Sequence, residues 1–321
     1  MIALGIDAGG TKTVFSLCDE SGCVLSMLRR PYTALPQLGE DAQREALLEG
    51  IQEALREAGE SFEAISAVCF GAPCWGESDS GDEAMRRSID RIFCSVPWMI
   101  CNDSQVAWAG SFALRPGINI VAGTGAIAFG MDMHGKMARC GGWGEYFADE
   151  GSGYWLGMRM LSLFCKESDG RLPKGVLYPL VRERFQLRSD FEVTDVFLRD
   201  YLPYRDKVAG LQLLLFEAAQ QGDENAVACY REAGCEIALN VKGILDRLDF
   251  PTSAEVSYSG GIFKVGTLVM DSFREALEVF GCTIVRPLAP PWVGALMTAM
   301  QLVSLDKPQV LEKLIEAGRE E

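Results

Sequence analysis

The first thirty residues alternate short apolar runs with small polar turns. Residues 1–8 form an apolar run that ends at a glycine pair, a second run follows, and a polar turn at 19–22 precedes a third. Apolar runs separated by tight turns are typical of a β-meander. Over 41–58 the apolar residues recur at helical spacing and Gly59 follows, which predicts a helix with a glycine stop.

Strands and helices alternate in the next segment. We expect a buried strand at 64–72, an acidic loop at 77–83, a short helix that carries Met85 and Ile89, and a strand at 96–101. Because parallel strands need crossover connections, this order predicts a parallel portion of sheet.

A second meander begins near Ile118 and repeats the first at an offset of about 114 residues. The matched pairs are Gly9 with Gly123, Phe15 with Phe129, Asp19 with Asp132, and Gly22 with Gly135. The repeat predicts an α/β protein of two similar domains, 1–114 and 115–321, each opening with a glycine turn that faces a common cleft.

The second domain carries a long helical segment. Residues 153–248 read as almost wholly helical, and 255–263 then give a strand and a glycine turn. A helix over 265–280, an edge strand and a closing helix that starts at a proline complete the expected order.

Composition narrows the function. The chain has 321 residues and a formal net charge of −15, which repels phosphate backbones and anionic lipid and argues against nucleic acid or membrane as the main partner. Eleven cysteines without CxxC spacing predict a reducing cytoplasm, and we expect most of them to be small core residues. The single histidine, His134, lies in a polar turn, where a surface position is expected.

The first glycine turn suits a phosphate group. Asp7 ends a strand, and the residues that follow it combine backbone freedom, hydroxyls and a positive charge: Gly9, Gly10, Thr11, Lys12 and Thr13. Glycines let backbone N–H groups approach a polyphosphate, and a carboxylate holds Mg²⁺ through water. A plain hairpin turn is the alternative. Gly123, Thr124 and Gly125 offer similar groups from the second domain.

Three further places carry candidate chemistry. Gly260 and Gly261 follow a strand, where adenine or ribose could lie against bare backbone, although a tight turn explains them equally well. Asp103 follows an apolar strand at a position that suits either a helix cap or a ligand site. Residues 140–153 combine glycines, acidic residues and three aromatics, including Trp143, and this mixture favours a loop that binds a polyhydroxylated ligand.

These segments together resemble the BadF/BadG/BcrA/BcrD ATPase family, and within it the branch similar to N-acetylglucosamine kinase. The resemblance rests on IDAGGTKT, FGAPCWG, CNDSQVAWAG, VAGTGAIAFG, RCGGWGEYFADEGSGYWLG, SGGIF and PPWVGALMTA. It implies a ribonuclease-H-like sheet in each domain, as in the actin-like ATPases, and ATP with Mg²⁺ in the cleft. It further implies a sugar acceptor and a homodimer.

The resemblance also implies roles for single residues. Asp103 would be the catalytic base and Asp7 the ligand of a metal-bound water. Thr11, Lys12, Thr13 and Thr124 would contact phosphates, Gly260 and Gly261 would lie at the adenosine, and Gly142, Trp143 and Asp149 would lie by the acceptor sugar.

Two departures from the family pattern concern the acceptor. Residues 32–39 contain no asparagine, and Ala126-Ile127 follow the second glycine turn where some members have serine and asparagine. The expected function is transfer of the γ-phosphoryl group of ATP to an amino sugar or N-acetylhexosamine. The alternative is an ATPase activator of an iron–sulfur dehydratase, which would need cysteines that share a cluster across a dimer.

Overall fold

The computed structural model describes residues 1–9, 12–31 and 39–319. The chain forms two compact units, one of Met1–Asn119, Phe129–Met137 and Arg286–Glu321, and one of Ile120–Ala128 and Ala138–Val285. Both units are therefore built from separate stretches of sequence. The domain boundary expected between residues 114 and 115 stays a prediction.

The first sheet has five strands in the order β3-β2-β1-β4-β5. β1 pairs antiparallel with β2 and parallel with β4, and β4 pairs parallel with β5. The opening meander and the parallel portion predicted from the sequence are both confirmed. The bounds are β1 Ile2–Ala8, β2 Lys12–Asp19, β3 Val24–Pro31, β4 Ile65–Ala72 and β5 Trp98–Asn102.

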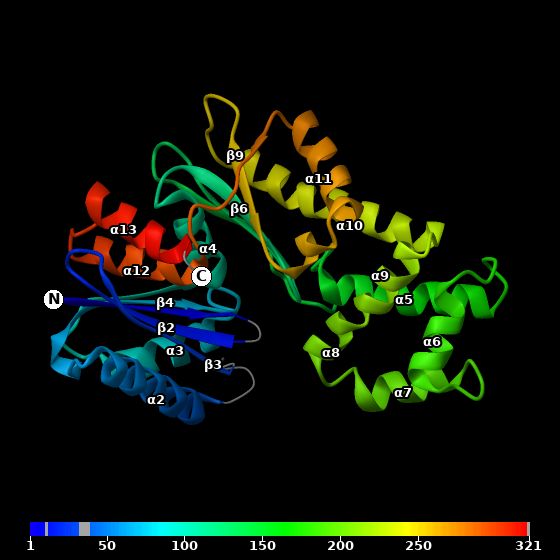
Figure 1. The fold of residues 1–321 in the computed structure, drawn as a ribbon, viewed down its shortest axis with the longest axis horizontal. Coiled ribbons are helices and arrows are strands. Elements are labelled where there is room, and N and C mark those ends of the chain that lie inside the picture. The colour runs from blue at the N-terminus through cyan, green and yellow to red at the C-terminus, as the bar shows by residue number, and fades with distance from the viewer. Residues whose placement is uncertain (10–11, 32–38, 320–321) are drawn as a thin grey trace. The chain divides into compact units, whose positions relative to one another are not determined.

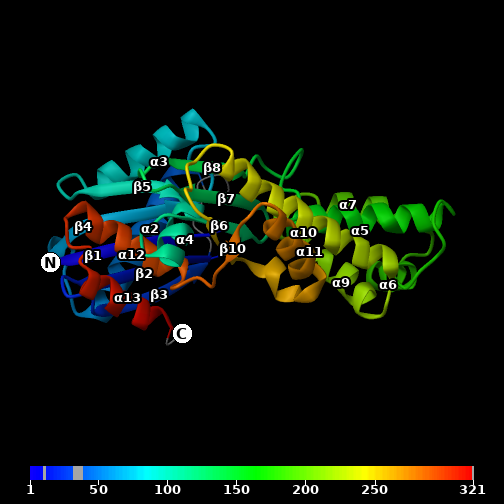
Figure 2. The same cartoon turned by 90° about the horizontal axis from the view of Figure 1, so that it is seen from above.

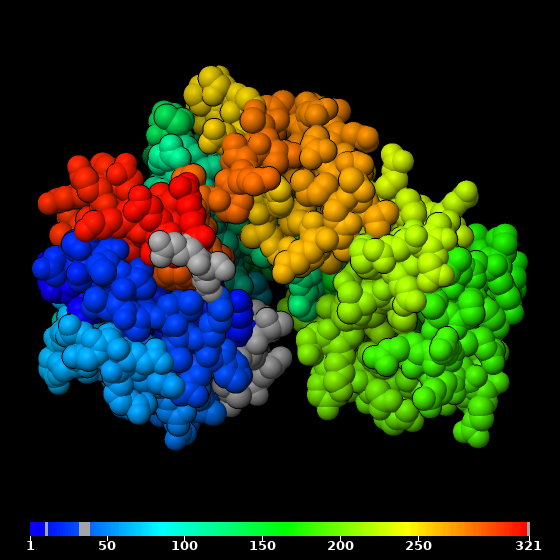
Figure 3. Space-filling view, in the orientation of Figure 1, coloured from blue at the N-terminus to red at the C-terminus, as the bar shows by residue number. Residues whose placement is uncertain are grey.

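Helices cover both faces of this sheet because its central strands are apolar on both sides. Leu4 and Ile6 of β1 pack with α2 (Glu40–Ala58) and α3 (Asp79–Ile92), whereas Ala3 belongs to the core under α12 (Pro291–Leu302) and α13 (Pro308–Arg319). Figure 1 shows α2 and α3 on one side of the sheet and α12 and α13 on the other. Side chains of α13, red in Figure 3, lie at the surface.

Two sequence expectations in this unit are wrong. The acidic stretch 77–83 is not a loop throughout, because α3 already begins at Asp79 and the Ser78 side chain accepts a hydrogen bond from the Gly81 N–H. Acidic side chains in a first helical turn complement the helix dipole. The helix at 291–302 does not close the fold, since α13 follows it.

Glycines let α4 (Asp103–Phe112) approach its neighbours closely. A Cβ atom on Gly71 of β4 would lie 2.5 Å from a Val106 methyl group. A Cβ atom on Gly294 of α12 would lie 2.0 Å from the Val106 carbonyl oxygen, and one on Gly110 would lie 2.6 Å from the Pro290 carbonyl oxygen. α4 is thus fixed against both the sheet and α12 by contacts that leave no room for a methyl group.

The second sheet has the order β10-β9-β6-β7-β8. Read from β8, this is the order of the first sheet, with the second meander in place of the first. Its bounds are β6 Gly117–Ala122, β7 Ala126–Met131, β8 Met137–Gly141, β9 Glu255–Ser259 and β10 Thr283–Ile284.

The internal repeat extends to the turn between the second and third strand of each meander. The Asp19 carboxylate accepts hydrogen bonds from the N–H groups of Ser21 and Cys23, at 2.9 and 3.0 Å. The Asp132 carboxylate accepts the equivalent bonds from His134 and Lys136, both at 2.9 Å. Side-chain closure of a turn by aspartate is a local preference of that residue, and here it occurs at matched positions.

The segment 153–248 is helical, as predicted. It contains α5 Gly153–Ser168, α6 Leu177–Phe185, α7 Glu192–Asp200, α8 Arg205–Gly210, α9 Gln212–Gln220 and α10 Glu224–Leu245. α11 (Thr267–Val279) lies beside α10 (Figure 2). A Cβ on Gly234 of α10 would lie 2.5 Å from the Val269 carbonyl oxygen of α11, so this contact also depends on glycine.

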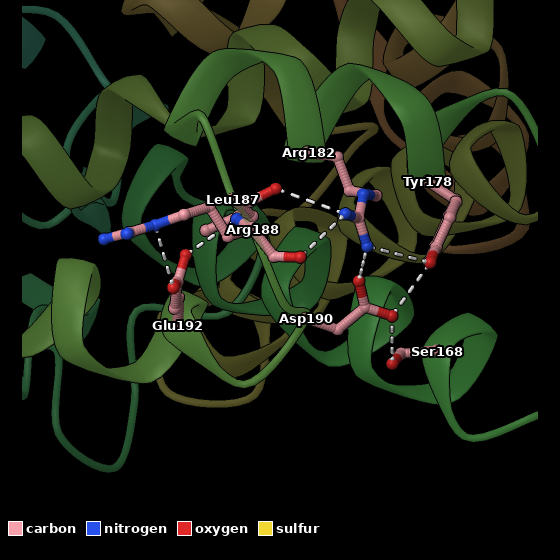
Figure 4. A network of polar contacts seen from close by, with 7 residues as sticks. All are labelled: Ser168, Tyr178, Arg182, Leu187, Arg188, Asp190 and Glu192. Atoms are coloured by element: carbon pink, nitrogen blue, oxygen red, sulfur yellow. Dashed lines mark hydrogen bonds and ion pairs between the residues drawn. The ribbon is translucent and has the colours of Figure 1, made fainter.

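A polar network joins α5, α6 and the segment before α7 (Figure 4). The Asp190 carboxylate accepts hydrogen bonds from the Ser168 hydroxyl at 2.6 Å and the Tyr178 hydroxyl at 2.8 Å, and it pairs with Arg182. These contacts hold the pKa of Asp190 below its usual range, with the Ser168 bond as the largest cause. The network fixes the far end of the helical segment.

The cysteines are less buried than expected. All eleven are free thiols, but only Cys18, Cys69, Cys101 and Cys229 are buried, while Cys23, Cys94, Cys165 and Cys235 are exposed. The expectation that most are core residues is therefore wrong. His134 is exposed, as predicted. None of the helices in the described ranges is long and apolar enough to cross a membrane.

The α4–α12 contact generates a prediction about stability. Gly294→Ala should lower the free energy of unfolding by about 1–3 kcal/mol or more, because the added methyl group meets backbone that cannot move aside. Gly81→Ala in α3 is the control, since its Cβ meets no atom nearer than 3.6 Å and alanine favours a helix. Urea unfolding measures both variants, and equal stabilities would contradict the role of Gly294.

Candidate active site

The carboxyl ends of three parallel strands bring two carboxylates to one edge of the first sheet. Asp7 near the end of β1 is paired in register with Gly71 of β4, and Gly71 is paired with Cys101 of β5. Asp103 begins α4 directly after β5. Ligands of open α/β sheets bind at this edge, so two sequence-predicted residues lie where such a site is expected.

The question of which residue caps α4 has a clear answer. The Asn102 side-chain oxygen accepts from the Ser104 N–H at 3.0 Å and from the Ser104 hydroxyl at 2.6 Å. Asn102 is therefore the N-cap, and the capping role does not fall to Asp103. Asp103 is partly buried in the first turn of the helix.

The Asn102 amide also holds the loop that follows β4. Its Nδ2 donates to the Trp75 carbonyl oxygen at 3.1 Å. The same loop is tied to α3, because the Gly76 N–H donates to the Asp82 carboxylate at 2.9 Å and Arg86 lies 5.5 Å over the Trp75 ring. One buried asparagine thus connects the loops after β4 and β5.

The environment of Asp7 disfavours its charge. The pKa of Asp7 is raised to about 7, mainly by burial and also by the nearby Asp103, while Lys12 opposes the shift. A carboxyl group with such a pKa responds strongly to any added cation.

The first glycine turn is tight. The Gly9 N–H donates to the Lys12 carbonyl oxygen at 2.9 Å. Lys12 is exposed, and Thr13 is buried. Gly10 and Thr11 lie outside the described residues.

The second glycine turn contacts the start of α5. The Gly123 N–H donates to the Gly125 carbonyl oxygen at 2.9 Å, and the Gly153 and Tyr154 N–H groups donate to the carbonyl oxygens of Gly123 and Thr124 at 2.8 and 3.2 Å. The glycine-rich loop before α5 therefore lies against this turn.

Asp149 is buried beside the same turn and is held by a residue that the sequence analysis missed. Its carboxylate accepts from Arg205 of α8 at 2.5 Å, and Arg205 also pairs with Glu145 at 3.2 Å. Burial raises the pKa of Asp149, and the Arg205 guanidinium opposes that effect. No local motif indicates Arg205, because it lies 56 residues after its partner.

The remaining candidates of the second unit directly follow β8 and β9. The Gly142 N–H donates to the Ala126 carbonyl oxygen at 3.0 Å, and the next residue, Trp143, is 71% exposed. Gly260 has a φ of 107°, and a Cβ there would lie 2.2 Å from the Ala122 carbonyl oxygen. A Cβ on Gly261 would meet nothing within 4 Å, so space is open at that residue.

The second unit thus contains four groups of sequence-predicted residues. They are the second glycine turn, Asp149, the pair Gly142 and Trp143, and the pair Gly260 and Gly261. The first unit brings together Asp7, the first glycine turn and Asp103. Among the described residues, no group of three or more His, Cys, Asp or Glu side chains is placed to hold a metal ion.

The two sheets of identical order, each opening with an antiparallel meander and a glycine turn, define the fold class. It is the two-domain actin-like ATPase fold with a ribonuclease-H-like sheet in each half and a helical insertion in the second. The chain belongs to the BadF/BadG/BcrA/BcrD ATPase family, whose model matches residues 4–299.

Two relatives of known description are similar over most of their length. An N-acetylmuramic acid/N-acetylglucosamine kinase of Clostridium acetobutylicum is 29% identical over 282 residues, which cover 86% of this chain and 90% of the relative. An N-acetyl-D-glucosamine kinase of Dictyostelium discoideum is 28% identical over 313 residues, 93% of this chain and 98% of the relative.

Solved structures agree in fold. A candidate N-acetylglucosamine kinase from Chromobacterium violaceum has a TM-score of 0.73 at 24% identity and covers 95% of this chain and 99% of its own. A ROK family glucokinase from Streptomyces griseus, solved with glucose and AMPPNP, has a TM-score of 0.56 at 18% identity, with 94% and 99% covered.

The contacts of Asn102 generate a prediction. Asn102→Ala should lower the free energy of unfolding by about 2 kcal/mol, about half from the lost helix cap and half from the lost hydrogen bond to the Trp75 carbonyl group. Asn102→Ser keeps an oxygen that can cap but no amide donor, so its loss should be about half as large. Urea unfolding measures the wild type and both variants. Equal stability of all three would contradict the two roles assigned to the Asn102 side chain.

The pKa of Asp7 generates a second prediction. Because the folded-state pKa of about 7 exceeds the unfolded value, the stability from this group is fully present below about pH 4 and is lost as pH rises through 7. The full effect is about 4 kcal/mol at most, since one pKa unit corresponds to about 1.4 kcal/mol.

Asp7→Asn should remove this component. The measurement is urea unfolding of the metal-free protein and the variant at pH 5 and pH 8. The wild type should lose more stability between these pH values than Asp7→Asn does. An identical pH dependence in both proteins would mean that Asp7 titrates normally.

Proposed function

We propose that this protein is an ATP-dependent sugar kinase that transfers the γ-phosphoryl group to a hydroxyl of an amino sugar or N-acetylhexosamine. The observation that carries the proposal is the pair Asp7 and Asp103 at the carboxyl edge of the first sheet, in a chain of this ATPase family. The substrate class is supported by the two relatives, both of which are named as kinases of N-acetylglucosamine.

Asp103 is the proposed catalytic base. Phosphoryl transfer needs mainly alignment and charge stabilisation, and a carboxylate near the acceptor hydroxyl suffices to receive its proton. Two observations support this role: Asn102 provides the helix cap, and the close packing of α4 fixes the backbone from which Asp103 projects.

The glycine turns are the proposed phosphate and nucleotide site. Backbone N–H groups and hydroxyls would contact the phosphates from Gly9, Gly10, Thr11, Lys12, Thr13, Gly123, Thr124 and Gly125. Gly260 and Gly261 would lie at the adenosine. The open space at Gly261 and the lack of room for a side chain at Gly260 support this, because a flat group needs bare backbone to lie against.

Asp7 is the proposed ligand of Mg²⁺, through water. A single carboxylate fits this ion, since Mg²⁺ keeps most of its water and binds substrate phosphates in kinases. The raised pKa of Asp7 also fits, because a neighbouring dication would favour the ionised carboxylate. When bound, the ion would neutralise charge on the transferred phosphoryl group.

Gly142, Trp143 and Asp149 form the proposed acceptor site. Trp143 offers an exposed ring on which a sugar can lie. Asp149 is buried and already accepts from Arg205 and the Ala126 N–H, which suits a group that orients hydroxyls rather than a base. Ala126 and Ile127 bring no polar side chains to this turn, so the polar contacts to the sugar that serine and asparagine would make there are absent.

Two further proposals concern the protein as a whole. We propose a homodimer, which rests on the family resemblance alone. We also propose a cytoplasmic location, which rests on the number and spacing of the cysteines.

The base assignment has a direct test. Asp103→Asn should lower kcat by about 10²–10⁴, because a carboxamide cannot accept the proton, while Kd for ATP stays within about twofold. A coupled ADP-release assay over amino sugars, N-acetylated sugars and simple hexoses identifies the acceptor and measures kcat.

Asp41→Asn is the matched control, since the Asp41 side chain is 89% exposed and its loss should leave turnover unchanged. Unchanged turnover in Asp103→Asn would refute the base assignment. No ADP release by the wild type with any sugar would refute the kinase itself.

A further inference from the structure

Arg205, the first residue of α8, lies between two carboxylates of the loop before α5. Its Nη2 is 2.5 Å from Asp149 Oδ2, and its Nε is 3.2 Å from Glu145 Oε2. The two pairs differ in exposure, because the side chain of Asp149 is 1% exposed and that of Glu145 is 20% exposed. Arg205 is therefore the cation that compensates a buried charge.

Both oxygens of Asp149 are held. Oδ1 accepts from the Ala126 N–H at 3.4 Å, at the end of the second glycine turn, while Oδ2 accepts from Arg205. Asp149 has a φ of 61°, a conformation that a residue other than glycine adopts at some cost in energy. The Arg205 contact and the backbone contact together fix the carboxylate in this unusual position.

The pair lies directly on the glycine turn. A Cβ on Gly125 would lie 2.6 Å from Arg205 Nη2 and 2.8 Å from Asp149 Oδ2. A side chain at residue 125 would therefore push this ion pair away from the turn. Through Arg205, α8 in the helical segment is connected to the loop that contains Gly142 and Trp143.

We propose that Arg205 is a positioning residue of the kinase site, which holds Asp149 ionised and oriented on the second glycine turn so that it can bind acceptor hydroxyls. This inference rests on the proposed function, because the acceptor role of Asp149 belongs to it. Arg205 itself need not touch the sugar, since its guanidinium is engaged by the two carboxylates.

Removal of Arg205 should make acceptor use depend on pH. The charged groups that face Asp149 are Arg205 from α8 and Glu145 from its own loop. Without the guanidinium, burial and Glu145 would both favour the protonated form of Asp149. Acceptor use should then be weak at low pH and recover as pH rises, whereas a structural defect would lower it equally at every pH.

The test compares Arg205→Gln with Arg205→Lys and with Arg199→Gln, whose parent side chain is 68% exposed in a pair with Asp200 on α7. For Arg205→Gln we expect kcat/KM for the acceptor to fall about 10- to 100-fold at pH 6 and much less at pH 9. Arg205→Lys, which keeps the charge, should recover most of the loss, and Arg199→Gln should match the wild type. A pH-independent loss, or no rescue by lysine, would overturn the proposal.

A second readout does not depend on activity. The Asp149 carboxyl carbon, assigned by its absence in Asp149→Asn, is titrated by ¹³C NMR in the wild type and the variants. Its midpoint should rise in Arg205→Gln and stay near the wild-type value in Arg205→Lys. An unchanged midpoint in Arg205→Gln overturns the positioning role.

The two readouts separate the two proposals. If the wild type phosphorylates no sugar while the Asp149 midpoint moves as expected, the kinase proposal fails but the Arg205–Asp149 coupling stands. If Arg205→Gln does not fold, the titration midpoints of Asp149 in Arg205→Lys and Glu145→Gln test the positioning role instead. Glu145→Gln removes a like charge and should lower the Asp149 midpoint, and a midpoint that rises would contradict the arrangement.

Discussion

The close approach of α4 to the first sheet and to α12 is the constraint on which the proposed chemistry depends. No loop separates Asp103 from the regular structure, because it is the first residue of α4 and follows β5 directly. Its position is therefore set by the helix axis, and the axis is set by contacts at Gly71, Gly110 and Gly294 that exclude even a methyl group. Close-packed interiors transmit such constraints because they cannot deform gradually.

The two units hold their buried carboxylates by different means. Asp7 lies in a desolvated position with a second carboxylate nearby, and its charge is disfavoured. The Asp149 side chain is only 1% exposed, but it has an arginine partner. The difference fits the proposed roles, because a group that binds a metal-bound water gains its counter-charge from the ion, while a group that orients a neutral sugar needs a permanent one.

Local signals explain why most of the fold could be predicted. The α2 helix has a regular apolar stripe and ends at Gly59 in the left-handed conformation, and the meanders are marked by glycine and aspartate turns. The start of α3 was missed because its first turn is polar, although Ser78 and the acidic residues after it are good N-terminal signals. The expected order ends with the proline-initiated helix α12, so α13 is not part of it.

The site was predictable only as far as its motifs are local. Asp103 could be located from the sequence because it directly follows an apolar strand. The sequence alone left open whether Asp103 caps the helix, since Asn102 and Ser104 are also good caps. Only the side-chain contacts of Asn102 resolve this. Arg205 could not be found at all, because an ion pair across 56 residues leaves no pattern in one sequence.

The internal repeat is most informative where its two copies differ. Ile6-Asp7-Ala8-Gly9 corresponds to Ile120-Val121-Ala122-Gly123, so the second copy keeps the strand and the turn but has valine where the first has its carboxylate. A dication bound through water and phosphates needs few protein ligands, and a second carboxylate would add negative charge beside an already anionic nucleotide. The second turn instead contacts the start of α5 and a compensated ion pair. In the proposed site the repeated turn would therefore serve two electrostatic tasks, and the residue at the strand end would decide which.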